Sequence, residues 1–331
     1  MLGQCLAGVK MGKAGTGKDR IGRREAVFTF TSVLAATFAS GCVPAGKTGQ
    51  VEVAWGKYGR RRQGEFNTPR AMAISPDDEI YVCDKEARIQ VFNGDGKYLR
   101  EWQTPEQYHG RPTGMSFDRK GRLAVADTHY YRVLFYEPDG KLVETLGGVH
   151  GSKPGEFNWV TDVAEDAEGN LIVSEYGDAD RIQVFSSSHE PKLEWGQTGR
   201  DLGQFSRPQS LAVGKDGRIF IADACNHRIQ IFRLEGDKSV QLNSWGELGT
   251  DVGKLRYPYG MTFNLDGQLL IAEWGNNRVQ KFTTEGKSLG VWGGLGREVG
   301  QLSQPWSVAV DSRGRTFVLD SYNHRVQRIS F

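Results

Sequence analysis

Two sets of side chains in this sequence combine types that could bind or transform a ligand. The first set places aromatic rings beside cations, and it consists of Tyr259, Trp274, Trp306, Arg70 and Lys85. Aromatic faces next to cations suit a peptide, a glycan or an acidic group, so this set predicts a binding platform. The alternative is ordinary packing of the same side chains at a rim.

The second set is Asp162 with Tyr176, which a metal-assisted lyase or hydrolase could use. A lone carboxylate could contact a ligand, or it could accept a hydrogen bond from a neighbouring strand. The six histidines form no HExxH or other close-set metal pattern, and no G-x-S-x-G segment marks a nucleophilic serine. We therefore expect no metal and no cofactor, and we assign no catalytic residue.

A repeat that occurs six times must position both sets. Its anchors lie 43 to 50 residues apart and are Pro69, Pro112, Val160, Pro208, Pro258 and Pro305. Each repeat alternates short apolar runs with D-G type turns, which is typical of four-stranded propeller blades. The sequence therefore predicts an all-β, six-bladed β-propeller over residues 51–331. Residues just after each anchor, and just after the acid that ends the second strand, should surround one mouth of the central channel.

The two ends of this region complement each other. The last repeat stops at Phe331, soon after its third strand, whereas the strand 51–55 has no repeat before it. Pairing the two ends closes the ring and removes an open sheet edge. We expect the N-terminal strand to complete the last blade.

An acid and an arginine flank the turn between the second and third strands of every repeat. Because the pair recurs in all six blades, it predicts a structural device and not a site. The pairs are Asp84 with Arg88, Asp127 with Arg132, Glu175 with Arg181, Asp223 with Arg228, Glu273 with Arg278, and Asp320 with Arg325.

Two histidines and two cysteines also have predicted places in the ring. His227 and His324 share one register of the repeat, so we expect them to close this turn and not to bind a metal. Cys83 and Cys225 fall in blades 1 and 4, too far apart for a disulfide.

The first 41 residues read as a signal peptide. Arg23-Arg24 precedes an apolar run over residues 26–40 that is too short to span a bilayer, and this layout resembles a twin-arginine export signal. Residues 39–42 resemble a lipobox, which predicts lipidation of Cys42 and a tether over residues 42–50. Ala26 and Ala39 depart from the Phe and the Leu, Val or Ile that these patterns favour, and an ordinary cleavage site is the alternative. We expect an exported, membrane-anchored lipoprotein facing the periplasm or the cell exterior.

Segments such as Asn226-His227-Arg228-Ile229 and Asn323-His324-Arg325-Val326 resemble the NHL repeat family, and the resemblance covers residues 51–331. It implies a propeller used mostly for binding, with a minority of enzymes. Residues 161–164 and 174–177 are similar to the peptidyl-hydroxyglycine lyase branch. However, Gln209 and Tyr259 stand where the resemblance implies metal-binding histidines.

Residues 42–331 carry 36 basic and 38 acidic side chains, which disfavours nucleic acid as a partner. The export signal and the lack of a RING-like Cys/His array disfavour the RNA-binding and ubiquitin-ligase members of the family. The sequence therefore predicts a monomeric, lipid-anchored binding module for a protein, peptide or glycan ligand. The alternative is a metal-assisted lyase or hydrolase that works in the channel.

Overall fold

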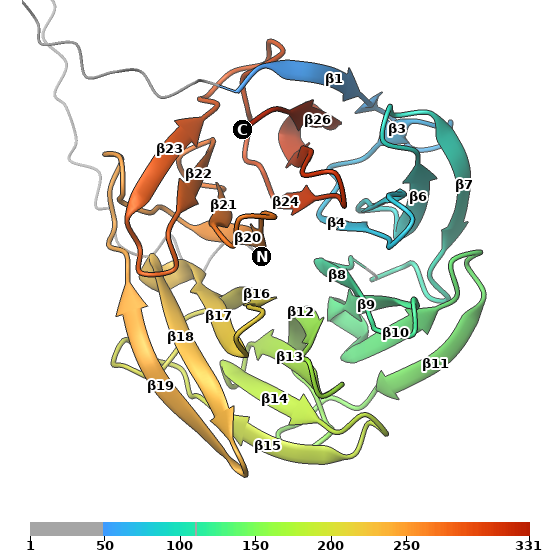
Figure 1. The fold of residues 1–331 in the computed structure, drawn as a ribbon. Helices are drawn as coiled ribbons and strands as arrows, with labels where there is room; N and C mark the ends of the chain where they lie inside the picture. The colour runs from blue at the N-terminus through green and yellow to red at the C-terminus, as the bar shows by residue number, and fades with distance from the viewer. Residues whose placement is uncertain (1–48, 110) are drawn as a thin grey trace, which may run out of the picture. The chain divides into compact units, whose positions relative to one another are not determined.

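The structure, a computed structural model, describes residues 49–109 and 111–331. These residues form six four-stranded antiparallel sheets arranged as a ring around a central channel (Figure 1). The predicted six-bladed β-propeller is confirmed. The predicted signal peptide over residues 1–41, the lipidation site Cys42 and residues 43–48 of the tether lie outside the described residues. Within the described ranges, no helix has the length and hydropathy that a membrane span requires.

Each blade is built from short runs rich in Val, Ile, Leu and Phe, which suit half-buried and buried strands. Five blades run in chain order from the innermost strand to the outermost. Blade 1 consists of β4 (Ala71–Ile74), β5 (Ile80–Cys83), β6 (Arg88–Phe92) and β7 (Tyr98–Gln103). Blade 2 consists of β8 (Gly114–Phe117), β9 (Leu123–Asp127), β10 (Arg132–Tyr136) and β11 (Leu142–Gly147). Blade 3 consists of β12 (Trp159–Glu165), β13 (Leu171–Tyr176), β14 (Arg181–Phe185) and β15 (Pro191–Trp195). Blades 4 and 5 consist of β16 (Pro208–Val213), β17 (Arg218–Asp223), β18 (Arg228–Glu235) and β19 (Lys238–Trp245); and β20 (Pro258–Phe263), β21 (Leu269–Glu273), β22 (Arg278–Phe282) and β23 (Ser288–Trp292).

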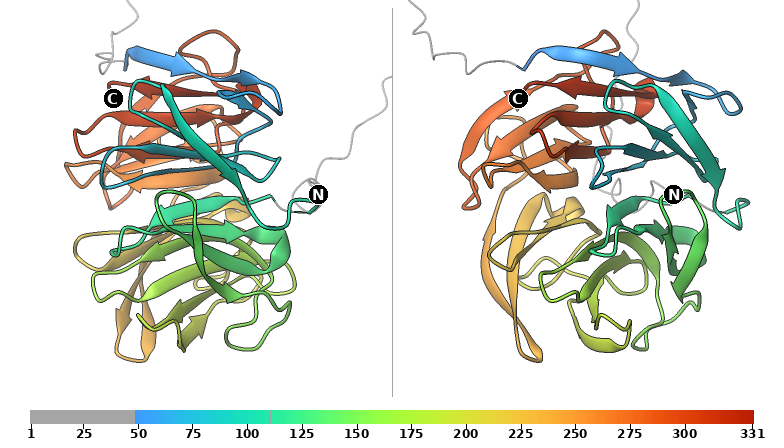
Figure 2. Two further views of the ribbon diagram at one scale, coloured as in Figure 1. Left: turned by 90° about the vertical axis from the view of Figure 1, so that its right-hand side faces the viewer. Right: turned by 45° about the vertical axis from the view of Figure 1, so that its right-hand side comes forward.

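Blade 6 is shared between the two ends of the described chain. It contains β24 (Ser307–Val310), β25 (Thr316–Asp320), β26 (Arg325–Ile329) and, as its outermost strand, β1 (Val51–Trp55). β1 pairs antiparallel with β26, so that Ala54 faces Gln327 and Trp55 faces Val326. Figure 2 shows β1 lying along the C-terminal strands. The predicted closure of the last blade by the N-terminal strand is confirmed, and β26 has no open edge.

Apolar side chains between neighbouring blades form the core. Three tryptophans near the ends of outermost strands, Trp55, Trp102 and Trp245, pack on glycine turns of the next blade; at Gly96, with φ 80°, a Cβ atom would lie 2.6 Å from the Trp55 ring. Glycine is therefore required both by the backbone and by the close ring. Cys83 is buried and free, so the predicted absence of a disulfide between Cys83 and Cys225 is confirmed.

The acid and arginine pairs are present in all six blades. Their N–O distances run from 2.6 to 3.4 Å, and all six carboxylates are fully buried. In blade 5, Arg278 also donates to the carbonyl oxygens of Thr250, Asp251 and Lys254 in the loop that enters the blade. Glu273 accepts the backbone N–H of Arg256 on the same loop. The pair thus fastens the loop to the blade, which confirms its predicted structural role.

Short elements fill the connections on the face that carries these turns. A parallel pair of β2 (Lys57–Tyr58) and β3 (Glu65–Phe66) lies in the connection to blade 1. Single 3-10 turns, η1 (Thr128–Tyr130), η2 (Ala224–Asn226) and η3 (Ser321–Asn323), join the second and third strands of blades 2, 4 and 6. The channel mouth discussed below opens on this face, where the innermost strands begin.

Candidate functional site

The residue just before the anchor has a left-handed backbone conformation in four blades. The φ angles of Thr68, Arg207, Tyr257 and Gln304 lie between 48° and 58°. A residue with a side chain pays a steric cost there, so the surroundings must hold it. Each of these residues is followed by proline, which adds to the restriction on its backbone.

Side chains from the preceding blade provide that support. The N–H of Thr68 donates to His324 Nδ1 at 3.0 Å, and the N–H of Tyr257 donates to His227 Nδ1 at 3.1 Å. At the next junction, Asn277 Oδ1 takes the place of the imidazole and accepts the N–H of Gln304 at 2.8 Å. We call these three bonds the blade latches. They span neighbouring blades and fix the direction of the residues that border the mouth.

The structure assigns His227 and His324 a larger task than closing a turn. Both do end a 3-10 turn in the left-handed conformation, as their shared register predicts. Because Nδ1 accepts a latch bond, the neutral ring is the useful form. Burial, with the charge of Arg256 second, lowers the pKa of His227 to about 4. Burial likewise lowers the pKa of His324.

Aromatic rings from blades 5 and 6 form the floor of the mouth. Tyr259 stacks on Trp274 with ring centroids 5.7 Å apart. The rings of Tyr259 and Trp306 meet edge to face, with centroids 4.9 Å apart. Tyr259 and Trp306 are only 5% and 7% exposed, whereas Trp274 is half-buried. The predicted aromatic residues therefore lie together, but two of them form a covered floor and not an open platform.

Cations cover this floor. The Arg70 guanidinium lies 4.8 Å from the Trp306 ring centroid. The Arg207 guanidinium lies 4.8 Å from the ring of Tyr176 and 5.4 Å from that of Tyr259, so one arginine joins blade 3 to blade 5. Cations held over aromatic faces gain from the ring quadrupole, more so where water is excluded. Tyr176, which the sequence analysis grouped with Asp162, thus lies in one cluster with the aromatic residues of the predicted platform.

These seven side chains are called the mouth site from here on: Arg70, Lys85, Tyr176, Arg207, Tyr259, Trp274 and Trp306. Its Lys85 ammonium lies 5.9 Å from the ring of Tyr322, which is exposed at the edge.

The mouth site carries positive charge without a balancing carboxylate. Within the described chain, no carboxylate forms an ion pair with Arg70, Lys85, Arg207 or the nearby Arg111. Burial, with repulsion from Arg111 and Arg207, lowers the pKa of Arg70 to about 10. Burial together with Arg70 and Arg111 also lowers the pKa of Lys85. Groups whose pKa values are shifted by burial and by neighbouring charges cluster at functional sites.

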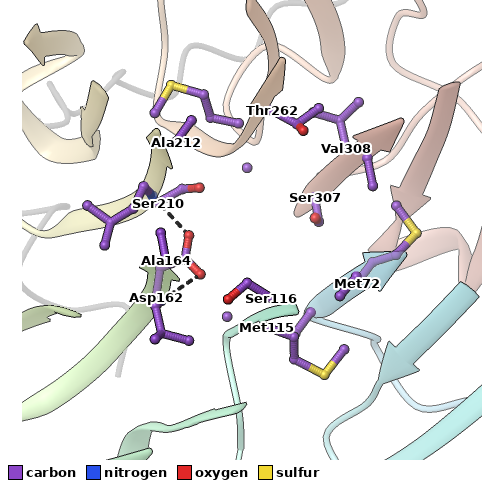
Figure 3. Close-up of a pocket in the computed structure, with 18 of the residues that line it drawn as sticks. Met72, Met115, Ser116, Asp162, Ala164, Ser210, Ala212, Thr262, Ser307 and Val308 are labelled. Carbon is purple, nitrogen blue, oxygen red and sulfur yellow. Dashed lines mark hydrogen bonds between the residues drawn. The ribbon is translucent and has the colours of Figure 1, made fainter. Parts of the chain in front are cut away.

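Below the mouth lies a cavity of about 350 Å³ lined by all six innermost strands (Figure 3). Asp162 is on its wall, but both carboxylate oxygens are engaged: Oδ2 accepts the N–H of Leu211 at 2.9 Å and Oδ1 accepts that of Val163 at 3.0 Å. The bond to Leu211 links blade 3 to blade 4. The sequence left Asp162 either a ligand contact or a hydrogen bond with a neighbouring strand, and the structure shows the hydrogen bond. A Cβ atom at Gly114 would lie 2.4 Å from Oδ1, which explains the glycine there.

Burial nevertheless raises the pKa of Asp162 to about 7, since the two amide donors and the Ser210 side chain only partly replace lost hydration. Among the described residues, no group of three or more His, Cys, Asp or Glu side chains is arranged to hold a metal ion.

Sequence reasoning identified six of the seven residues of the mouth site but missed Arg207. It considered the positions after each anchor, whereas Arg207 stands immediately before one. The signal was available, because the pre-anchor positions hold Thr68, Arg111, Trp159, Arg207, Tyr257 and Gln304. None of these matches the small residues that dominate the innermost strands.

Comparison with known proteins agrees with this architecture. The NHL repeat model matches residues 205–232 and 302–329. NHL repeat-containing protein 3 of Mus musculus is 25% identical over 199 residues, which cover 55% of this chain and 56% of that protein, so the chain spans about half the length of this relative. A probable peptidyl-alpha-hydroxyglycine alpha-amidating lyase of Caenorhabditis elegans is 31% identical over 112 residues, 34% of this chain and 27% of that protein. The structure of a putative gluconolactonase superposes with a TM-score of 0.63 at 14% identity, over 86% of this chain and 93% of that one, and this likeness concerns the fold alone.

Proposed function

Because the chain is an NHL-repeat β-propeller, we propose that it is a binding module that presents the mouth site to a protein, peptide or cell-envelope ligand. One observation carries this proposal: Arg70 and Arg207 are held on aromatic rings at the channel mouth, and no carboxylate of the described residues pairs with either. Aromatic and arginine side chains at the centre of a surface are the groups that dominate binding energy.

A second candidate function is lyase or hydrolase chemistry in the channel. The observation in its favour is that Asp162 lines the cavity, where burial raises its pKa to about 7. Against it, the carboxylate already accepts two backbone N–H groups and ties blade 3 to blade 4. Binding at the mouth is therefore the first proposal.

The two candidates separate by mutation. We expect Trp274→Ala to weaken a ligand found by screening envelope glycans and peptides by at least about tenfold, since a central aromatic anchor is lost. Tyr108→Ala is the matched control, because Tyr108 is 90% exposed and outside the mouth site. If Trp274→Ala leaves the affinity unchanged while Asp162→Ala abolishes turnover or metal uptake, the channel enzyme replaces the binding module.

Export and anchoring complete the proposal. We propose that residues 1–41 direct export and that lipidated Cys42 tethers the propeller to a membrane, on the strength of the signal-like and lipobox-like segments. Cys42→Ser should move the protein from the membrane fraction to the soluble fraction. A wild-type protein that fractionates as soluble and carries no acyl mass would contradict the anchor, without bearing on the mouth site.

A further inference from the structure

The mouth site contains donors that have no acceptor. The Arg70 guanidinium makes no hydrogen bond within the described residues, and its Nε is buried. The indole N–H groups of Trp274 and Trp306 are likewise buried without an acceptor in the described chain. Buried donors are normally paired, and leaving one unpaired costs about 1–3 kcal/mol. Within the described ranges, unpaired indole N–H groups also occur at Trp55, Trp102 and Trp195, but at the mouth they lie together with two guanidinium groups that have no carboxylate partner. This combination points to an acceptor that comes from outside.

The guanidinium group of Arg207 is held in one orientation by its neighbours. Its Nε donates to Gln209 Oε1 at 2.9 Å, and its plane is held by the rings of Tyr176 and Tyr259. Its backbone N–H also bonds to Asp180 of the preceding blade. The terminal nitrogens of Arg207 have no partner within the described residues. A guanidinium fixed in this way loses little entropy when it binds an oxyanion through two parallel N–H bonds.

The two guanidinium groups belong to one site. Arg70 lies on Trp306, Arg207 lies on Tyr259, and these two rings are in contact at 4.9 Å. Arg111 and Lys85 add charge at the edge. The site thus combines two planar cations, further positive charge and apolar ring surface, and it offers donors far in excess of acceptors.

We propose that the mouth site binds a carboxylate or phosphate group carried on an apolar or aromatic body. Arg70 and Arg207 donate to the oxyanion, and the ring surface of Trp274 with the edges of the floor contacts the body. This inference rests on the proposed binding function and names the ligand's chemical class. The same chemistry occurs on small metabolites and on end groups of envelope polymers.

Equilibrium dialysis with matched probes tests this class. The probes are 2-naphthoate, its neutral isostere 2-naphthamide, and inorganic phosphate as a competitor, all at one low ionic strength. The purified full chain should bind naphthoate at least about tenfold more tightly than naphthamide, because hydrogen bonds from a guanidinium to a carboxylate are stronger than those to a neutral amide oxygen. Phosphate should compete with naphthoate if the site recognises the oxyanion without the apolar body. A lack of competition by phosphate would assign the site to carboxylates held on a larger body.

Variants place the binding at the mouth. Arg70→Ala and Arg207→Ala should each weaken naphthoate at least about tenfold and leave naphthamide unchanged. Arg313→Ala is the control, since its side chain is 70% exposed on a turn between the first and second strands of blade 6, at the opposite end of the channel. Thermal melting of each variant shows that it is folded.

The outcomes distinguish this inference from the proposed function. Equal binding of naphthoate and naphthamide, both lost in Trp274→Ala, would overturn the anionic class and retain an aromatic binding site. Naphthoate binding that survives both arginine substitutions would also overturn it. If neither probe binds and the screened envelope ligands are insensitive to Trp274→Ala, the inference and the proposed function both fail.

Discussion

Arginines at the blade turns and arginines at the channel mouth share one side chain but have opposite surroundings. The six turn arginines recur with the repeat, and each pairs with a buried carboxylate; five of them, all but Arg132, also donate to backbone carbonyl groups. The two mouth arginines, Arg70 and Arg207, do not recur, and their guanidinium groups lie on aromatic rings without an ion pair to any carboxylate of the described chain. Repetition with an ion pair to a buried carboxylate marks the scaffold, and departure from the repeat without such an ion pair marks the surface available to a ligand.

Removing a turn arginine should give the largest effect. Arg278→Ala leaves Glu273 buried beside an empty space and frees the carbonyl oxygens of Thr250, Asp251 and Lys254. Loss of one partner of a buried pair costs about 3 kcal/mol or more. We expect a markedly lower thermal midpoint by circular dichroism. A midpoint equal to that of the wild type would refute the structural role of these pairs.

The blade latches should give an intermediate and pH-dependent effect. Because folding lowers the pKa of His227 and His324, the unfolded chain takes up protons first as the pH falls. The stability from the latches is complete above pH about 6.5, the ordinary histidine pKa, and for His227 it is lost progressively down to a pH of about 4.

Asparagine provides the matched control for the latches, since Asn277 performs the same task at the next junction. His227→Asn with His324→Asn should keep the stability at pH 7 and reduce its loss in acid. Alanine at the same two positions should cost about 1 kcal/mol each at pH 7. Denaturant unfolding across this pH range measures both effects. An asparagine variant as sensitive to acid as the wild type would show that other groups control the loss.

Removing a mouth arginine should give the smallest effect on stability. Arg70→Met deletes a desolvated charge that Arg111 and Arg207 repel, and it keeps apolar contact with Trp306. We expect the free energy of unfolding to change by less than about 1 kcal/mol. A loss comparable to that of Arg278→Ala would place Arg70 in the scaffold and erase the contrast between the two regions.

The sequence was sufficient for the scaffold because every blade restates the same signals. The anchors and the acid and arginine pairs each occur six times, and the glycine of the turn between the first two strands occurs five times, so the strand order and the closure by Val51–Trp55 follow from the repeat. Asp162 could be singled out as an exception, but its bond to Leu211 depends on the adjacent blade and was only one of two open roles.

The mouth site was less accessible to sequence reasoning for the same reason. The Arg207 side chain contacts Tyr176 and Tyr259, which lie on two other blades, and no spacing along the chain predicts that contact. The covered state of Tyr259 and Trp306 also follows from three-dimensional packing, because the arginines and Trp274 lie over them.

Fluorescence quenching of Trp274 tests the central claim, that the mouth site holds unbalanced positive charge, most directly. Trp274 is half-buried at the site, and subtracting the emission of Trp274→Phe isolates its signal. Positive potential concentrates anions and repels cations, most strongly at low ionic strength. We predict that iodide quenches this component several times more effectively than caesium, and that Arg70→Met combined with Arg207→Met removes the difference. Equal quenching by iodide and caesium in the wild type would contradict the account.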